Sequence, residues 1–396
     1  MSRRQLFGSL CAMAFLVNLA RIVFAPLLQP AAGDFGVTAA SLGVVTSGTW
    51  LGSAAPRLPT GYLLTRLPRH YVIAGTGALL VVTSAFTGLA GSVLHLTAGA
   101  FLMGVSSGMY FIAANPLVSE LFPDRVGSAL GVHGTAAQLS AVGAPLVLGA
   151  ILVVGDWRTT FFCIAAVAAL STLALLIAAR RTALPEAGAA DRSLLAAGRE
   201  QWPLILTGIA FIGAAGFLWN ALFNLYGDYL AVAKGIDPGT GRLLLSLMFA
   251  AGVPAFLVTG RLADAVPNVP LLLGIVGTFC LSVFALTLVK GFLPIVVLSV
   301  VIGYVVHSLF PAIDTYMLSG LPDRHRASAY SLFSSSMMLV QALGSGVVGT
   351  AVAGGLSYDV AFQGIAAGVS VIVASLFVLY RADRLPAGGI PGETPA

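Results

Sequence analysis

The sequence predicts an all-α membrane protein with twelve transmembrane helices, arranged as two pseudo-symmetric six-helix bundles. Three observations predict this fold class. Of the 396 residues, 58% are hydrophobic and only 9% are charged, against about 25% charged in an average soluble domain. Continuous apolar stretches such as 161–179 and 360–380 can span a bilayer as helices, whereas membrane barrel strands alternate apolar and polar residues. Motifs of the first half also recur in the second half at a nearly constant distance.

Apolar windows of about 20 residues predict six spans in each half of the chain. The first six are expected at residues 6–29, 38–63, 71–91, 94–119, 127–153 and 159–179. The second six are expected at residues 204–230, 241–263, 270–289, 292–319, 326–353 and 359–380. The first stretch follows Arg3 and Arg4, as in a twin-arginine export signal, but Arg21 within it and the eleven spans behind it favour a retained helix.

The long polar connection at 180–202 separates the two sets of spans. We therefore expect an N-terminal six-helix bundle at 1–179, a cytoplasmic linker at 180–203, a C-terminal six-helix bundle at 204–380 and a cytoplasmic tail at 381–396.

Basic residues select the side of the membrane on which the termini lie. An even number of spans places both termini on one side, and most arginines fall in the loops of that side. The opposite side holds only four basic residues, Arg158, Lys234, Arg242 and Lys290. Both termini are therefore predicted to be cytoplasmic, with the protein in the plasma or inner membrane. Topology and lipid headgroups account for the net charge of +5, so no basic surface is left for a nucleic acid.

An internal repeat supports the division into two bundles. Gly61 and Gly260 are 199 residues apart, and so are Gly104 and Gly303. The same distance separates Phe111 from Phe310, Asn115 from Asp314 and Arg125 from Arg324, while Ser128 and Ser328 are 200 apart and Asn18 and Asn220 are 202 apart. Parallel repeats of this kind predict a pseudo-two-fold axis along the membrane normal.

Several motifs carry a family resemblance. The loop at 61–69 has a second copy at 260–267, residues 122–125 are followed by a glycine-containing stretch at 127–131, and Trp157 and Arg158 precede Phe161 at the start of span six. Together with the repeat, these motifs resemble the major facilitator superfamily of membrane transporters across almost the whole chain. The resemblance implies alternating-access transport of a small solute through a central site between the halves, with no enzymatic activity.

The departures from the family pattern make the two halves unequal. The loop motif normally has an aspartate where Thr65 stands, whereas the second copy keeps Asp264. That aspartate would cap a neighbouring helix N-terminus and hold nearby arginines. Closure of the cytoplasmic side is therefore expected to depend more on Asp264 than on Thr65. The gating residues that this resemblance implies are Gly61, Arg66, Arg69, Asp264, Arg125 and Arg324, and Arg57 is a further candidate for gating.

Arg21 is the main polar residue predicted inside the membrane. It lies roughly 22 Å into span one at 1.5 Å per residue, and Asn18 precedes it by one turn on the same face. A charge in hydrocarbon costs at least about 2.5 kcal/mol, so it faces a cavity or a partner. Arg21 is either a guanidinium fork for a carboxylate or another oxyanion, or one half of a structural pair.

Further polar residues lie in spans four, seven and ten, which the resemblance places around a central cavity. Span seven carries Asn220, Asn224 and Asp228 at intervals of four, and span ten carries His307 and Asp314. Candidate substrate-binding residues are Arg21, Asn18, Asn115, Asn220, Asn224 and His307, and candidates for proton coupling are His307, Asp314 and Asp228. The alternatives are hydrogen bonding between helices and, for Asp314, pairing with loop arginines.

Arg57 allows a second interpretation, because nitrate and nitrite porters have an arginine in a similar context. Their matching arginine in span eight would fall where Phe256 stands. We therefore interpret Arg57 as structural or gating and keep nitrate as an alternative.

These observations favour a secondary transporter of a small organic anion such as a carboxylate, linked to protons and sufficient as a monomer in the lipid bilayer. The alternative is efflux of a drug or other amphipathic compound, with Asp228 and Asp314 as the acids available for a cation. A receptor or membrane enzyme is a third class. The sequence lacks paired carboxylates, a zinc spacing, a catalytic triad, a Walker loop and a dinucleotide motif, so we expect no enzyme, cofactor or metal.

Overall fold

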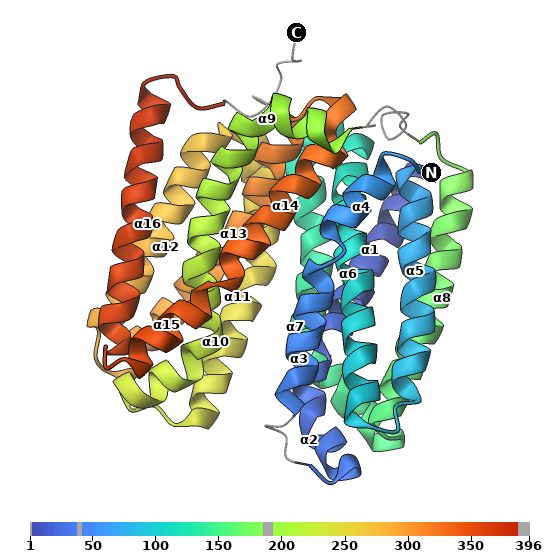
Figure 1. The fold of residues 1–396 in the computed structure, drawn as a ribbon, viewed down its shortest axis with the longest axis horizontal. Helices are drawn as coiled ribbons and strands as arrows, with labels where there is room; N and C mark the ends of the chain where they lie inside the picture. Colours follow the sequence, from blue (N-terminus) through green and yellow to red (C-terminus); the bar gives the residue numbers. More distant parts are fainter. Residues whose placement is uncertain (1, 38–41, 185–192, 387–396) are drawn as a thin grey trace. The chain divides into compact units, whose positions relative to one another are not determined.

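The computed structural model describes residues 2–37, 42–184 and 193–386, and the regular elements within them are helices (Figure 1). The helices of the first half are α1 (Ser2–Ile22), α2 (Phe24–Phe35), α3 (Gly43–Ala54), α4 (Arg57–Leu64), α5 (Arg69–Gly88), α6 (Val93–Leu121), η2 (Pro123–Arg125), α7 (Val126–Val154) and α8 (Trp157–Arg180). Those of the second half are α9 (Leu194–Gly208), the π-helical turn η4 (Ile209–Gly213), α10 (Ala214–Lys234), α11 (Pro238–Ala265), α12 (Asn268–Leu288), α13 (Phe292–Gly320), η5 (Asp323–His325), α14 (Arg326–Ala342), α15 (Gly344–Ala353) and α16 (Tyr358–Arg381).

The helices match the predicted spans with few differences. Ten helices within the described residues are long and apolar enough to cross a membrane, and an eleventh is obtained when the bent α7 is counted as one span. The remaining predicted span, 38–63, corresponds to α3 and α4, which are separated at Ala55 and Pro56. Proline lacks the amide that continues a helix, which accounts for the break. α9 begins at Leu194, so the helix reaches into the predicted linker.

Residue contacts divide the chain into two compact units. Unit 1 comprises Met1–Phe122, Ala136–Ala196 and Asp323–Leu332, and unit 2 comprises Pro123–Thr135, Ala197–Pro322 and Phe333–Ala396. The first part of α7 belongs to unit 2, and η5 with the first part of α14 belongs to unit 1. The bundle boundaries at 179 and 204 stay a prediction.

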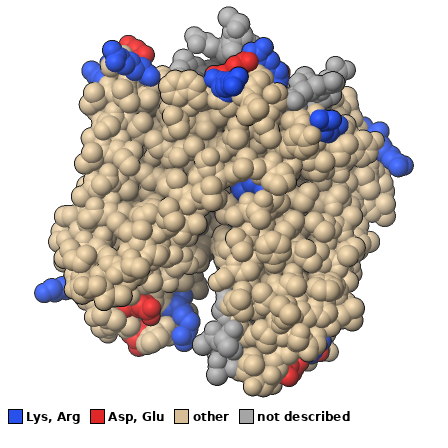
Figure 2. Space-filling model, in the orientation of Figure 1, with Lys and Arg blue, Asp and Glu red and all other residues tan. Residues whose placement is uncertain are grey.

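Charged side chains mark the ends of the helices. Figure 2 shows Lys, Arg, Asp and Glu gathered near the upper and lower edges of the view, with almost uniformly uncharged atoms between them and one small basic patch in the middle. Polar caps start several helices at these ends. Ser92, Asp156, Asp237 and Ser357 each accept a hydrogen bond from the backbone amide three residues later. Such caps satisfy amides that the first turn of a helix leaves without a partner.

The same helix pairs pack in both units. α3 packs on α6 and α5 on α8 in unit 1, as α11 packs on α13 and α12 on α16 in unit 2. Gly104 of α6 lies against the backbone of α3 at Thr49, and Gly303 lies against the backbone of α11 at Met248. A β-carbon at either glycine would collide with that backbone. Small residues at equivalent positions therefore allow the close helix approach on which membrane packing depends.

Candidate functional site

Arg21, near the end of α1, is held by uncharged groups. Its Nη2 donates to Asn18 Oδ1 at 2.5 Å, and its Cζ lies 4.6 Å from the ring centroid of Trp50 on α3. Its Nε is buried and has no hydrogen-bond partner among the described residues. The tryptophan face attracts a guanidinium but carries no net charge to neutralise it. The arrangement therefore presents a cation, with a donor to spare, inside a membrane span.

Hydrogen bonds to α7 orient the Asn18 side chain so that its Oδ1 accepts from Arg21. Its Nδ2 donates to Ala137 O at 2.7 Å and to Ser140 Oγ at 3.0 Å, both on α7. With the amide nitrogen turned to α7, Oδ1 faces the guanidinium. The predicted pair Asn18 and Arg21 is thus a hydrogen-bonded unit in which Asn18 positions Arg21.

Arg57 is a buried arginine of unit 1. It is the first residue of α4, only 7% exposed, and its Nε donates to Ser53 O at 3.2 Å. That carbonyl lies four residues earlier, so the side chain runs back across the break toward the last turn of α3. Unit 1 therefore contains both Arg21 and Arg57 among the predicted residues.

A buried ion pair lies at another point of unit 1. Arg69 and Glu120 form an ion pair in which both side chains are almost fully buried, with Arg69 Nε 3.0 Å from the carboxylate oxygens. Arg326 adds a longer contact to Glu120 at 3.8 Å and pairs with Asp323 at 2.6 Å. Glu120 and Arg326 were absent from the predicted site. The sequence feature that could have indicated Glu120 is a carboxylate at the end of an apolar span.

Three other predicted residues of unit 1 make contacts with neighbouring side chains. Gly61 packs so closely on the Ser331 side chain of α14 that a β-carbon would collide with it. Asn115 is 7% exposed, and its Nδ2 donates to the Tyr330 hydroxyl at 2.9 Å. Arg66 is exposed and contacts Tyr62 of its own segment.

His307 occupies an aromatic cluster in unit 2. Its Nδ1 lies 2.6 Å from Gly303 O, and because a carbonyl only accepts, Nδ1 carries the proton. The neighbouring ring centroids lie at 5.7 Å for Trp219, 5.5 Å for Phe249, 6.4 Å for Phe256 and 6.3 Å for Phe310. The imidazole is 4% exposed. This surface suits an apolar or aromatic group.

The other polar residues predicted for unit 2 do not gather into one site. Asn220 Oδ1 accepts from Ser345 N at 3.3 Å, and Asn220 O accepts from Asn224 Nδ2 at 3.0 Å. Asn224 and Asp228 are exposed, and Asp314 lies half-buried on α13, two turns beyond His307. Asn220 therefore makes a contact between α10 and α15.

Asp264 caps the start of α7. Its Oδ1 accepts from Gly127 N at 2.6 Å, and its Oδ2 accepts from Ser128 N at 2.7 Å and from Ser128 Oγ at 2.5 Å. A carboxylate that binds free amides at a helix N-terminus is stabilised by hydrogen bonding and by the helix dipole. Thr65, its counterpart in the repeat, instead donates to Tyr62 O of its own segment at 2.7 Å. Among the described residues, Asp264 therefore contacts Gly127 and Ser128 at the start of α7. Arg125 and Arg324 are exposed.

The comparisons with known proteins agree with this fold. The sequence model of the family described as Major Facilitator Superfamily matches residues 10–230 and again residues 209–396. The chain belongs to the major facilitator superfamily. It is accordingly a multi-pass membrane protein and a secondary transporter, and this family consists of transporters and not of enzymes.

Similar proteins include relatives with and without an assigned substrate. The chain is 26% identical over 285 residues to the "Probable sulfoacetate transporter SauU" of Cupriavidus necator, a match that covers 67% of this chain and 66% of that relative. It is 25% identical over 391 residues to the uncharacterized MFS-type transporter YwfA of Bacillus subtilis, covering 94% and 91%. The solved structure of the proton:xylose symporter XylE superposes with a TM-score of 0.79 at 13% identity, covering 98% and 97%. This last likeness concerns the fold alone.

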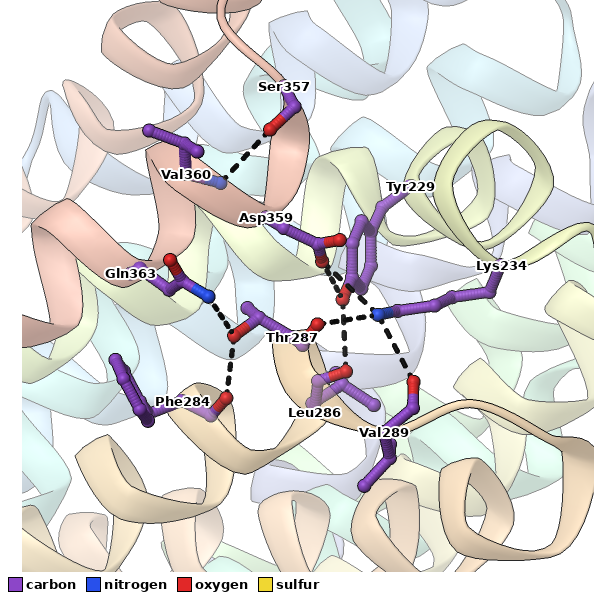
Figure 3. A network of polar contacts seen from close by, with 10 residues as sticks. All are labelled: Tyr229, Lys234, Phe284, Leu286, Thr287, Val289, Ser357, Asp359, Val360 and Gln363. Carbon is purple, nitrogen blue, oxygen red and sulfur yellow. Dashed lines mark hydrogen bonds and ion pairs between the residues drawn. The ribbon is translucent and has the colours of Figure 1, made fainter.

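A polar network that the sequence did not predict joins three helices of this transporter (Figure 3). Lys234 Nζ lies 3.2 Å from Asp359 Oδ1 and donates to Thr287 O at 2.9 Å and Val289 O at 3.3 Å. Tyr229 donates its hydroxyl to Asp359 Oδ1 at 2.9 Å. Gln363 Nε2 donates to Thr287 Oγ1 at 2.9 Å. The network ties the ends of α10 and α12 to the start of α16.

Proposed function

We propose that this secondary transporter carries a small organic anion and that Arg21 binds the anionic group of the substrate. The observation that carries the proposal is that the described partners of Arg21 are all uncharged. Its described partners are an amide oxygen and an indole ring, and a buried N–H has no acceptor. A charge inside the membrane without a carboxylate partner is costly, and a planar guanidinium matches carboxylate and sulfonate oxygens. The name of the Cupriavidus necator relative, a sulfonated carboxylate transporter, supports the same class of substrate.

We further propose that transport proceeds by alternating access and is linked to protons, with both termini cytoplasmic. Moving one elementary charge against the membrane potential costs about 2.3 kcal/mol per 100 mV. Uptake of an anion into a negative-inside compartment therefore requires cotransported cations or exchange for another anion. His307, Asp314 and Asp228 are the candidates for carrying the proton.

Efflux of an amphipathic compound is the second candidate, favoured by the rings around His307. An aromatic surface binds a lipophilic cation through its ring faces. Against it stands the exposure of Asp228, which is not a buried acid of the kind that a cation would need. Nitrate is a weaker alternative, because Phe256 stands where a nitrate porter would have a second arginine.

The test is substrate-driven proton flux and uptake in proteoliposomes. Monocarboxylates, dicarboxylates, sulfonates, nitrate and lipophilic cations are compared for wild type and Arg21→Gln, with Arg180→Gln as the control. Arg180 is exposed at the end of α8, so its variant removes the same charge without touching the proposed site. The proposal expects wild type to transport one class of anion. Uptake of that anion should fall about tenfold or more, equivalent to 1.4 kcal/mol, in Arg21→Gln and not in Arg180→Gln. Cation transport that survives Arg21→Gln would overturn it.

A further inference from the structure

We infer that the transported anion carries an aromatic ring, and that this ring packs on a cluster of aromatic side chains in unit 2. The inference rests on the proposed function, because it assumes that an anion binds at Arg21. It deepens that function by naming the class of substrate, an aromatic carboxylate or sulfonate. The aromatic cluster consists of the four rings beside His307, which are Trp219, Phe249, Phe256 and Phe310, together with Phe223.

The rings of the aromatic cluster are partly exposed around a buried imidazole. All five rings are of intermediate exposure, whereas His307 is 4% exposed. His307 lies on α13, about 20 Å from either end of the helix at 1.5 Å per residue. Since α13 is long and apolar enough to cross a membrane, the cluster lies at mid-membrane depth, where an exposed ring faces either lipid or water.

Polar residues of α10 indicate that the rings face water. Asn224 directly follows Phe223 and is exposed, and so is Gly227. Successive residues of a helix are about 100° apart, so Gly227 lies between Phe223 and Asn224 on the helix surface. Asn224 is about 15 Å from the end of α10 at Lys234. Polar side chains at such depth face the bundle interior or a water-filled space, and this side of α10 is therefore hydrated.

Three of the rings form a corner that offers both faces and edges. Trp219 and Phe223 lie at 27° to each other with their centroids 5.8 Å apart, and Phe249 meets both nearly at right angles, at 71° and 88°. A further aromatic ring in this corner would make offset and edge-to-face contacts, which are attractive beyond the area that they bury. A saturated ring of the same size lacks the negative face and positive edge on which those contacts depend.

The repeat relates this corner to the proposed anion site. Phe223 stands 202 residues after Arg21, and Phe249 stands 199 residues after Trp50. In unit 1, Arg21 Cζ lies 4.6 Å from the ring centroid of Trp50. In unit 2, the centroids of Phe223 and Phe249 are 5.4 Å apart. The same contact therefore presents a cation in one unit and an apolar ring in the other, and an aromatic anion carries one group suited to each.

The test compares anions that differ only in the ring. Benzenesulfonate is paired with cyclohexanesulfonate, and phenylacetate with cyclohexylacetate. KM for uptake is measured in proteoliposomes, with uptake into protein-free liposomes subtracted. The saturated ring has at least as much apolar surface, so burial alone would favour it or leave the pair equal. We expect wild type to prefer the aromatic member, with a KM lower by about fivefold.

Two leucine variants separate recognition of the ring from apolar packing. Trp219→Leu and Phe223→Leu should each raise the KM for the aromatic anion about fivefold, while the KM for the saturated anion changes much less. Trp219→Phe should keep most of the preference, because it keeps an aromatic ring. The control is Trp202→Leu, which removes an exposed tryptophan of α9 in the same unit and should keep the wild-type preference. An unchanged preference in both leucine variants would overturn the inference.

Wild type alone provides a second refutation, which holds even where a variant fails to fold. Equal KM values for aromatic and saturated anions would overturn the inference, and so would transport of methanesulfonate or acetate without transport of any ring compound. In both cases, loss of uptake in Arg21→Gln would leave the proposed function standing. Uptake of every anion that survives Arg21→Gln would instead overturn the proposed function.

Discussion

Arg158 and Asp359 occupy equivalent positions in the two repeats and carry opposite charges. They are 201 residues apart, and each is the second residue of its helix, α8 or α16. Arg158 pairs with Asp34 and donates to Ala90 O at 3.2 Å. Asp359 pairs with Lys234, which donates to Val289 O, and Val289 is 199 residues after Ala90.

The same three-helix junction is thus closed by an ion pair in both units, with the charges exchanged. In each junction the cation reaches a carbonyl just beyond the C-terminal end of the third helix, α5 or α12. Cations are favoured at such ends by the helix dipole and the free carbonyl groups. This requirement explains why one member of each pair must be basic, although either helix can supply it.

The exchanged charges predict rescue in a double variant. Lys234→Asp alone and Asp359→Arg alone should each lower the melting temperature of the detergent-purified protein. Each variant places two like charges side by side at positions 234 and 359, and the native Lys234 side chain is only 5% exposed. The double variant recreates the arrangement of unit 1 and should recover part of the loss. A coupling energy of about 1 kcal/mol or more is expected from a double-mutant cycle. Additive losses would show that the two junctions are not equivalent.

Thr65→Asp should stabilise the protein by adding a helix cap. Gly61 packs on Ser331 in unit 1 as Gly260 packs on Gly131 in unit 2, so the two loop motifs approach their partner helices in the same way. An aspartate at 65 would then face the first turn of α14, as Asp264 faces that of α7. The expected gain is about 1 kcal/mol, read as a higher melting temperature. Thr65→Val is the control, and a Thr65→Asp protein that melts no higher than Thr65→Val would contradict the prediction.

The junction of unit 1 predicts a dependence of stability on pH. Hydrogen bonds from Arg158 and Trp157 lower the pKa of Asp34 below its ordinary value. A carboxyl whose pKa is lower in the folded state contributes stability above the pKa of the unfolded chain, about 3.9, and loses it as pH falls through the folded value. Asp34 is 44% exposed, so the contribution is about 0.2–1 kcal/mol.

The measurement is the melting temperature of wild type and Asp34→Asn between pH 7 and pH 3. Wild type should melt higher at pH 7, and the difference should shrink toward pH 3. A difference that stays constant down to pH 3 would assign the effect of Asp34 to packing and not to its charge.

Much of the fold could be predicted from the sequence, because the apolar windows and the offset of 199 residues are properties of the chain itself. The break at Ala55 and Pro56 was missed because hydropathy continues across it. The exchanged charges at Arg158 and Asp359 were also missed, since the offset there is 201 and the charges differ in sign. Periodicity indicated that Asn18 and Arg21 share a face, but no sequence pattern indicates that Trp50 of another helix covers Arg21.

The repeat also shows why the two units present different surfaces. His307 stands 199 residues after Gly108, and Phe256 stands 199 residues after Arg57. Where unit 1 has an arginine and a glycine, unit 2 therefore has an aromatic ring and an imidazole in contact with each other. The repeat supplies one scaffold, and different residues at matching positions place a buried cation in unit 1 and an imidazole among aromatic rings in unit 2.

The most direct test of the account is whether an anion binds at Arg21, and Trp50 offers a reporter 4.6 Å away. The transported anion is titrated into detergent-purified wild type, Trp50→Phe and Arg21→Gln while intrinsic fluorescence is recorded. The account predicts a saturable change in wild type, most of which disappears in Trp50→Phe, and no change in Arg21→Gln over the same concentrations. A saturable change in Arg21→Gln with the midpoint of wild type would contradict it.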